Sequence, residues 1–163
     1  FGKNIKYILD GGKSTIGLES TIINLTDKPT VLRLGGLDIE KIQRVLGSKM
    51  NINITPKRII ASGQLRIHYS PGIPLQMNIV EPKKDQAFIL IKKRKIKSNN
   101  YFYISKKNNL NEAAKNLYSC LRKIKNAGYK SIAVERISNK GLGKAINDRL
   151  NRASNFWTLN SNI

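Results

Sequence analysis

The chain has 163 residues, with 30 Lys and Arg against 10 Asp and Glu, so its formal net charge is +20. This length is enough for one domain or two small ones, and a hydrophobic content of 40% excludes a wholly disordered chain. No apolar run approaches the roughly 20 residues that cross a bilayer, and the N-terminus lacks a secretory pattern. One cysteine, Cys120, and one histidine, His68, exclude a disulfide framework and Cys-rich or His-pair metal sites. We therefore expect a soluble, cytoplasmic protein.

The first third of the chain predicts three strands and a helix. Residues 5–9 are a β-prone run that ends in a Gly-rich turn, and residues 22–25 and 30–33 are two further β-prone runs. Asp38 stands as an N-cap before apolar residues spaced three and four apart, which predicts a helix that Gly47 stops.

Residues 51–84 have a different character. Prolines and glycines recur along this stretch and break regular elements, although its composition is not of low complexity. A loop longer than about 15 residues is usually functional or a linker. We expect this one to be both.

The last third predicts an α/β unit. Residues 87–91, 101–104 and 131–134 are strand candidates, and residues 110–127 and 142–153 carry the apolar periodicity of helices. Strands alternating with helices of these lengths indicate a small parallel sheet with covering helices.

The positive charge has two interpretations. A field of this sign attracts polyanions such as RNA or ATP, and residues 92–97 hold a cluster of Lys and Arg. An AT-rich coding sequence, however, enriches Lys, Asn and Ile whatever the function. No aromatic RNA-binding signature accompanies the cluster, so at this level we favour compositional bias over a dedicated nucleic-acid patch.

Several polar positions are candidates for a site, each with a structural alternative. Arg33 ends a predicted strand, where it is either a solvated charge or a phosphate ligand, since its fork suits paired oxygens. Tyr69, beside His68, has the chemistry to stack on a base or to donate to a phosphate. Gly141 and Gly143 either present helix amides to an anion or form a plain helix-start turn.

Five stretches of the sequence occur in a recognisable order. They are Asp-Gly-Gly at 10–12, Gly-Leu-Glu-Ser-Thr-Ile at 17–22, Val-Leu-Arg-Leu-Gly-Gly at 31–36, Ser-Gly-Gln-Leu-Arg-Ile-His-Tyr-Ser-Pro at 62–71, and Gly-Leu-Gly-Lys-Ala-Ile-Asn-Asp-Arg-Leu-Asn-Arg-Ala at 141–153. In this order the chain resembles the two-domain threonylcarbamoyl-AMP synthases of the YrdC type.

The resemblance implies an α/β fold in three parts. Residues 1–55 would be the C-terminal part of a YrdC-like catalytic domain with a twisted open sheet, residues 56–84 a linker or lid, and residues 85–163 a small Rossmann-like domain. The chain opens at Phe1 rather than at a methionine. We therefore expect the C-terminal portion of a longer protein.

The family resemblance also implies a reaction. Such enzymes join L-threonine, bicarbonate and ATP into threonylcarbamoyl-adenylate and pyrophosphate, and a partner transferase complex passes the threonylcarbamoyl group to a tRNA adenosine. ATP enters as a substrate together with Mg²⁺, and the resemblance implies no protein-bound metal and no membrane partner.

The resemblance assigns roles to few residues of this chain. By it, Ser20 would contact threonine, Arg33 the ATP phosphates and Tyr69 the nucleotide, while His68 and Pro71 would belong to the lid. No residue is implied to be catalytic with certainty. In the family, further Lys and Arg residues that grip ATP lie in a region with no counterpart here, so we expect the chain alone to lack much of the active site.

Three functional readings stay open from the sequence. The chain is one portion of a threonylcarbamoyl-AMP synthase that works with a missing N-terminal half in trans, a non-catalytic basic module that binds tRNA or a partner protein, or a degenerate remnant. Under the module reading, tRNA binds with a steep salt dependence while ATP and threonine bind no better than controls.

Overall fold

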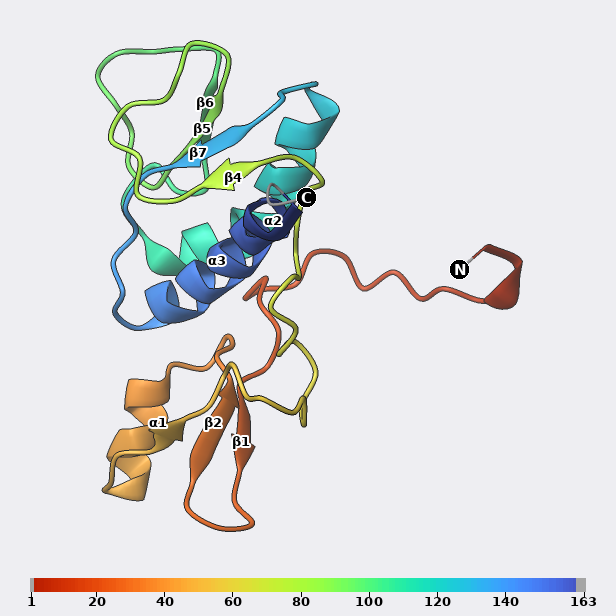
Figure 1. The fold of residues 1–163 in the computed structure, drawn as a ribbon, viewed down its shortest axis with the longest axis vertical. Coiled ribbons are helices and arrows are strands. Elements are labelled where there is room, and N and C mark those ends of the chain that lie inside the picture. The colour runs from red at the N-terminus through yellow and green to blue at the C-terminus, as the bar shows by residue number, and fades with distance from the viewer. Residues whose placement is uncertain (1, 161–163) are drawn as a thin grey trace.

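The computed structural model describes residues 2–160, and for residues 156–160 it describes the backbone alone. Two separate sheets lie one above the other in Figure 1, with the first third of the chain forming the lower part and the last half the upper part. The α/β class expected from the sequence is confirmed.

The first sheet has three short strands in the order β1-β2-β3. Their bounds are Ile22–Asn24 for β1, Thr30–Arg33 for β2 and Asn51–Ile52 for β3. β1 pairs antiparallel with β2 across the predicted turn, and β3 joins β2 in parallel. A parallel neighbour requires a crossover, and helix α1 (Ile39–Leu46) supplies it.

Helix α1 begins and ends where its sequence signals predict. The Asp38 side chain accepts a hydrogen bond from the Glu40 amide at 3.0 Å, which satisfies one of the donors left free at a helix start. Gly47 adopts the left-handed conformation at the other end, with φ of 66°. Both predicted ends of this helix are confirmed.

The strand predicted for residues 5–9 is wrong. A short 3-10 helix, η1 (Gly2–Asn4), is followed by irregular chain, and this segment extends away from the rest of the molecule in Figure 1. Ile8 and Leu9 are 83% and 99% exposed. A β-prone run forms a strand only when a neighbouring strand accepts its hydrogen bonds, and no described strand lies beside it.

The second sheet is wholly parallel, in the order β4-β7-β5-β6. The strands are β4 (Leu75–Gln76), β5 (Ala87–Leu90), β6 (Tyr101–Tyr103) and β7 (Ile132–Val134), and the helices are α2 (Leu110–Asn126) and α3 (Leu142–Asn160). The predicted strands and helices of this third are confirmed, with α3 running beyond the predicted end. The two-residue strand β4, within the segment expected to be irregular, is an addition.

Both helices cover the same face of the second sheet (Figure 1). Leu117 of α2 and Ile146 of α3 are fully buried there against Ile89 and Val134 of the sheet. No described helix covers the opposite face: there Phe88 and Leu90 of β5 pack with Tyr101 and Tyr103 of β6 and with Ile79 of a loop. The sheet is therefore sandwiched between a helical layer and a loop layer.

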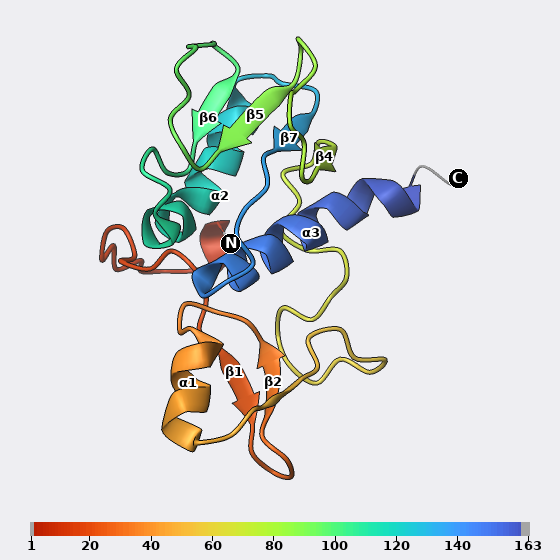
Figure 2. The same ribbon diagram turned by 90° about the vertical axis from the view of Figure 1, so that its left-hand side faces the viewer.

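Helix α3 joins the two parts of the molecule. Figure 2 shows it lying between the second sheet and the β1-β2 region. Its Ala145 belongs to the buried core of the first sheet together with Val31 and Ile39, while its Ile146 belongs to the core of the second. One helix thus contributes adjacent residues to two cores.

The domain boundaries at 55/56 and 84/85 stay predictions. The strand pairing between β4 and β7 connects Leu75 of the linker to the following domain, and the outermost positions, Phe1 and residues 161–163, lie outside the described residues. Within residues 2–160, no helix has the length and apolar character to cross a bilayer.

Candidate functional site

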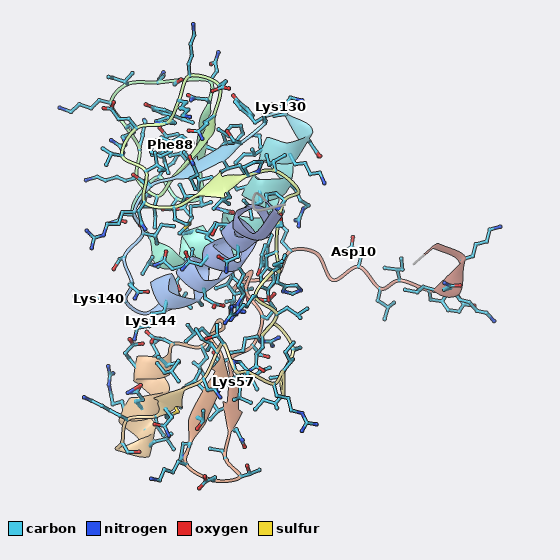
Figure 3. All side chains as sticks on the ribbon, in the orientation of Figure 1. Asp10, Lys57, Phe88, Lys130, Lys140 and Lys144 are labelled. Carbon is cyan, nitrogen blue, oxygen red and sulfur yellow. The ribbon has the colours of Figure 1, made fainter. Side chains whose placement is uncertain are left out.

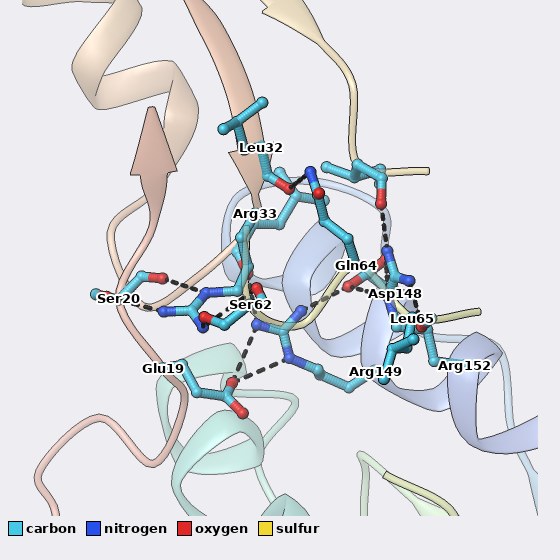
Figure 4. Close-up of polar contacts among 12 residues, drawn as sticks. Glu19, Ser20, Leu32, Arg33, Ser62, Gln64, Leu65, Asp148, Arg149 and Arg152 are labelled. Atoms are coloured by element: carbon cyan, nitrogen blue, oxygen red, sulfur yellow. Dashed lines mark hydrogen bonds and ion pairs between the residues drawn. The ribbon is translucent and has the colours of Figure 1, made fainter. Parts of the chain in front are cut away.

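Arg33 lies at the end of β2 and is held by two serines from different parts of the chain (Figure 4). Its Nε donates to the Ser20 carbonyl at 2.9 Å, its Nη2 to Ser20 Oγ at 3.0 Å, and its Nη1 to Ser62 Oγ at 2.9 Å. Ser20 precedes β1, whereas Ser62 belongs to the linker. The half-buried guanidinium is therefore not a free charge: it fastens the linker to the strand end.

Ser20 reaches Arg33 because the chain crosses Gly35 at very short range. A Cβ at Gly35 would lie 2.3 Å from the backbone of Ser20 and Thr21, so any other residue there would clash. The Gly36 amide donates to the Glu19 carbonyl at 2.8 Å and fixes the crossing. Gly35 thus allows a close backbone approach, whereas Gly36 makes room for the Ile16 side chain.

Gln64 anchors the linker a second time. Its side-chain amide nitrogen donates to the carbonyls of Leu32 and Asn53, at 3.1 and 3.2 Å, and its oxygen accepts from the amides of Ile60 and Ala61, both at 3.0 Å. Gln64 is only 3% exposed. A buried amide with four partners rigidifies its surroundings, because each partner lost would leave a buried polar group unsatisfied.

Tyr69 enters the same cluster from the linker. It has φ of 63°, a left-handed conformation that a Tyr adopts only where its surroundings enforce it. A Cβ on Gly63 would meet the Tyr69 hydroxyl at 3.2 Å and Arg33 Cδ at 3.0 Å, so Gly63 allows both side chains to lie close. The Tyr69 ring stacks on Tyr118 of α2, with centroids 5.6 Å apart.

Arg149 of α3 brings the helical layer into the cluster. Its side chain is 1% exposed; Nε donates to Glu19 Oε2 at 3.0 Å and Nη2 to the Leu34 carbonyl at 2.7 Å. Its guanidinium carbon lies 5.0 Å from the centroid of the Tyr69 ring, which is a cation–π arrangement. Arg149 therefore contacts the first sheet, the linker and the segment before β1.

Arg152 lies one helical turn further along α3, and its side chain binds backbone carbonyls in and just before the linker. Its Nη1 donates to the Leu65 carbonyl and its Nη2 to the Ile54 carbonyl, both at 2.7 Å. Asp148 accepts from Arg152 Nε at 3.0 Å and also pairs with Arg149, so one carboxylate orients both guanidinium groups. Arg149 thus binds α3 to the segments before and after the β1-β2 pair, and Arg152 binds α3 to residues 54 and 65 (Figure 4).

These contacts shift the pKa values of Glu19 and Tyr118. Burial alone would raise the pKa of Glu19, but its backbone hydrogen bond and the positive charge of Arg149 outweigh burial and hold that pKa below its ordinary value of 4.5. Burial, reinforced by the charge of Glu19, raises the pKa of Tyr118, whose hydroxyl lies 3.2 Å from the Glu19 carboxylate oxygens. Tyr118 is thus a neutral donor to an ionised Glu19.

The structure brings three of the predicted site residues together and separates two. Ser20, Arg33 and Tyr69 converge at the junction between β2, the linker and α2. His68 is exposed and touches the Tyr69 ring edge on, at 3.9 Å between centroids. Pro71 is buried and lines a cavity of about 240 Å³ beside Tyr69 and Tyr118 rather than the Arg33 contacts.

No metal centre is visible in the part of the chain that the structure describes. Across residues 2–155 no three His, Cys, Asp or Glu side chains gather closely enough to hold an ion. Cys120 is buried, as expected of a small core residue, and burial raises the pKa of its thiol to about 12. The amides of Gly143 and Lys144 donate to backbone carbonyls, which favours the helix-start reading of this segment.

Sequence reasoning did not assign the long-range contacts that hold the cluster together. Those contacts join Gln64, Arg149 and Arg152 to residues 11 to 130 positions away in the chain, so local spacing carries little trace of them. One signal was present in the sequence. Asp148 precedes Arg149 by one residue and Arg152 by four, and all three lie among the apolar residues of an amphipathic helix. Charged residues there are buried only when paired.

Comparison with known proteins places this junction in a family. The family model for the threonylcarbamoyl-AMP synthase C-terminal domain matches residues 37–155. The chain belongs to the threonylcarbamoyl-AMP synthase family. A Pyrococcus abyssi threonylcarbamoyl-AMP synthase is 35% identical over 178 residues, and those of Bacillus subtilis and Schizosaccharomyces pombe are each 28% identical.

These threonylcarbamoyl-AMP synthases are longer than the matched region. The alignments cover 96%, 92% and 92% of this chain but 51%, 49% and 45% of the P. abyssi, B. subtilis and S. pombe proteins. The chain thus spans about half the length of the relatives it matches.

Solved structures agree with the sequence comparison. The crystal structure of P. abyssi Sua5 complexed with L-threonine superposes with a TM-score of 0.80 at 29% identity, covering 96% of this chain and 51% of that one. A P. abyssi Sua5 variant with a consecutive His and Tyr both replaced by Ala superposes with a TM-score of 0.68 at 27% identity, over 94% and 48%. The arrangement of the two sheets is therefore that of the Sua5 proteins.

Proposed function

We propose that this chain supplies the linker, the small domain and the adjoining end of the catalytic domain in a threonylcarbamoyl-AMP synthase. The complete synthase would form threonylcarbamoyl-adenylate and pyrophosphate from L-threonine, bicarbonate and ATP, in support of tRNA modification. The observation that carries the proposal is the convergence of Ser20, Arg33, Ser62 and Tyr69 at one junction, in a chain 35% identical to such a synthase.

The reaction needs the residue types found at this junction. The amine nitrogen of threonine first forms a bond to the carbon of bicarbonate, and water leaves to give the carbamate. A carbamate oxygen then attacks the α-phosphorus of ATP, the bond to the β-phosphate breaks, and pyrophosphate leaves. Nucleophile and triphosphate are both anionic, so a fixed cation in a site closed to water lowers the barrier. Arg33 would provide that cation, and Ser20 would bind the threonine that becomes the carbamate.

Ser62 gives Arg33 a way to respond to a substrate. Three nitrogens of Arg33 already donate to Ser20 and Ser62. We infer that an ATP phosphate oxygen would compete with Ser62 Oγ for Arg33 Nη1, because a phosphate oxygen is the stronger acceptor for a guanidinium group. Binding of ATP would then release Ser62 and move the linker that carries it. Mg²⁺ would enter on the phosphates as part of the substrate.

Tyr69 is proposed to contact the nucleotide from the linker side. Its enforced backbone conformation and its stacking on Tyr118 hold an aromatic face near Arg33. In a solved variant of a relative, a consecutive His and Tyr are both replaced by Ala, and His68-Tyr69 is the one His-Tyr pair in this sequence. His68 and Pro71 would belong to the lid that Tyr69 closes.

The test is pyrophosphate release by a chimaera. The part of the P. abyssi synthase that the match leaves uncovered would be joined to this chain, since the chain spans about half of that relative. The chimaera should release pyrophosphate only when threonine, bicarbonate and ATP are all present. Arg33→Ala should lower kcat/KM by a factor of about 100, the effect of removing one charge-stabilising donor.

A matched variant separates local from general effects of lost charge. Lys49→Ala removes one positive charge from an exposed position between α1 and β3 and should leave the rate within twofold of the parent. Equal rates for Arg33→Ala and Lys49→Ala in a folded chimaera would contradict the role proposed for Arg33. A chimaera that binds tRNA but consumes no ATP would favour the binding-module reading instead.

A further inference from the structure

The face of the second sheet that carries no helix holds a basic cavity that the synthase reaction does not use. The cavity has a volume of about 580 Å³, and four cationic side chains line it: Lys83, Lys84, Arg94 and Lys95. Phe88 and Tyr101 form its inner wall, and Glu81 is its one acidic lining residue. A second cavity, of about 610 Å³, continues from it by way of Arg94 and adds Arg136.

The cations on one wall are held by the fold. The amide of Lys92 donates to Glu135 Oε1 at 3.3 Å, that of Lys93 to the Lys106 carbonyl at 3.1 Å, and that of Arg94 to the Tyr103 hydroxyl at 3.3 Å. The backbone is therefore pinned at three successive residues just before Lys95.

The opposite wall is fixed by a buried glutamine. Gln86 is 5% exposed. Its side-chain oxygen accepts from the Lys83 backbone amide at 3.0 Å, and its backbone amide donates to the Lys83 carbonyl at 3.1 Å. The Gln86 carbonyl also accepts from the Asn100 side chain at 2.8 Å, and Asn100 lines the cavity. Lys83 and Lys95 are thus presented from two loops that are both tied to the sheet.

The charge of this cavity is largely uncompensated. Arg94 pairs with Glu135 at 3.2 Å and lies over the Phe88 ring, 5.9 Å from its centroid. Lys83, Lys84 and Lys95 form no ion pair with any residue that the structure describes. Exposed aliphatic side chains stand at the rim, where Val80 is 78% and Ile96 is 76% exposed. An anion that also carries apolar or aromatic surface matches this lining.

We propose that this cavity is a binding site for single-stranded RNA. Lys83, Lys84 and Lys95 would neutralise successive backbone phosphates, while one unpaired base would rest between Tyr101 and the rim side chains Val80 and Ile96. Single-stranded nucleic acids are bound in this way, by a cationic groove that follows the backbone and by aromatic surfaces for bases. The site lies in the second sheet, away from Arg33, and the proposal does not depend on the proposed function.

The test measures binding of a fluorescently labelled 12-nucleotide single-stranded RNA to the full chain by anisotropy, over a series of salt concentrations. The double variant Lys83→Glu/Lys95→Glu should weaken binding at least tenfold at moderate salt. It should also reduce the slope of log affinity against log salt by about 1.4, since each phosphate contact to a single strand contributes about 0.7. Tyr101→Leu should weaken binding about tenfold with an unchanged slope.

A matched double variant supplies the control. Lys49→Glu/Lys130→Glu makes the same change in net charge at two exposed positions outside the cavity, and Figure 3 shows Lys130 next to the C-terminal end of α2. The control should bind RNA within twofold to threefold of the parent. Thermal melts of all variants establish that each remains folded.

Three results would overturn the proposal. Equal losses in the two double variants would mean that RNA responds only to net charge. Competition by adenosine monophosphate at the same phosphate concentration as the oligonucleotide would mean that the cavity takes free nucleotides. Equal binding of an RNA duplex would mean that no unpaired base is bound. Pyrophosphate release by the chimaera should be unaffected by Lys95→Glu, which changes a residue outside the linker, so this proposal and the synthase proposal fail separately.

Discussion

The two sheets of this molecule are stabilised in different ways. The second sheet buries a large core of its own, in which Leu117, Ile124 and Ile146 are fully enclosed by strands and helices. The described core of the first sheet has five buried residues, and one of them, Ala145, comes from α3. Leu25, which follows β1, and Val45 of α1 stay exposed in this region. The candidate site thus sits on the part of the molecule that depends on the other part for its support.

This difference explains where the polar network lies. Buried charged groups cost free energy unless they are paired, and they make little contribution to a core that is already well packed. At the junction they bind α3 to the first region of the chain and to the linker, through Arg149 and Arg152. The site is held in place by hydrogen bonds directed at backbone carbonyls, which require the correct geometry.

Separating the two regions should give the largest effect. A fragment of residues 70–163 keeps β4 and the whole second core, and it should show a cooperative thermal transition by circular dichroism. A fragment of residues 1–66 loses Ala145 and the Arg149 contacts, and it should show none. A cooperative transition in the shorter fragment would contradict the dependence described here.

The same approach tests the predicted domain boundary. A fragment that begins at residue 85 lacks β4, and with it Leu75, which is 4% exposed in the core. It should therefore melt at a lower temperature than the fragment that begins at residue 70. Equal melting temperatures would show that the linker contributes nothing to the small domain.

A core substitution should distinguish the regions next. Leu117→Ala removes a fully buried side chain at the centre of the larger core, so it should lower the free energy of unfolding by about 4 kcal/mol. Leu46→Ala in α1 affects a residue that is 45% exposed and should cost less than about 1 kcal/mol. Urea denaturation measures both, and comparable losses would contradict the assignment of stability to the second sheet.

The cap of α1 should have a smaller effect. Asp38→Ala removes the side chain that accepts from the Glu40 amide, and it should destabilise the first region by about 1 kcal/mol. Asp38→Asn retains the capping oxygen and should restore most of that loss. Failure of Asn to rescue would show that the charge of Asp38, rather than its cap, is what stabilises the helix.

The smallest effect is a dependence on pH. The folded protein holds the pKa of Glu19 below 4.5, so ionised Glu19 stabilises the fold above that pH, and its contribution is lost as pH falls through the lower, folded pKa. The difference in stability between the parent and Glu19→Gln should therefore shrink below pH 4.5. A difference that stays constant from pH 7 to pH 3 would mean that Arg149 does not interact with the Glu19 charge.

The sequence predicted local structure better than it predicted the site. Helix α1 followed from Asp38, Gly47 and the apolar spacing between them, because caps and periodicity are local signals. The run at residues 5–9 has the same kind of signal and forms no strand, because a strand also needs a neighbour. The two-residue strand β4 was not predicted for the converse reason: its pairing with β7 depends on a partner over 50 residues away.

The site was predicted in part. Arg33 and Tyr69 were candidates from their own chemistry, Ser20 was named on the family resemblance alone, and the structure places all three close together. What positions them, chiefly Gln64 and Arg149, was not predicted, since both residues donate to backbone carbonyls far away in the chain. Any residue has a carbonyl, so no pattern of residue types reveals such a contact in advance.

Native-state hydrogen exchange on Arg149→Met tests the central claim most directly, namely that α3 holds the Arg33 region in place. Methionine keeps much of the volume of the side chain but removes the donors to Glu19 and Leu34. The account predicts that amides in β2, such as Val31, lose protection while amides in β5 and β7, such as Ile89, keep theirs. Equal loss of protection in both sheets, or no loss in β2, would contradict it.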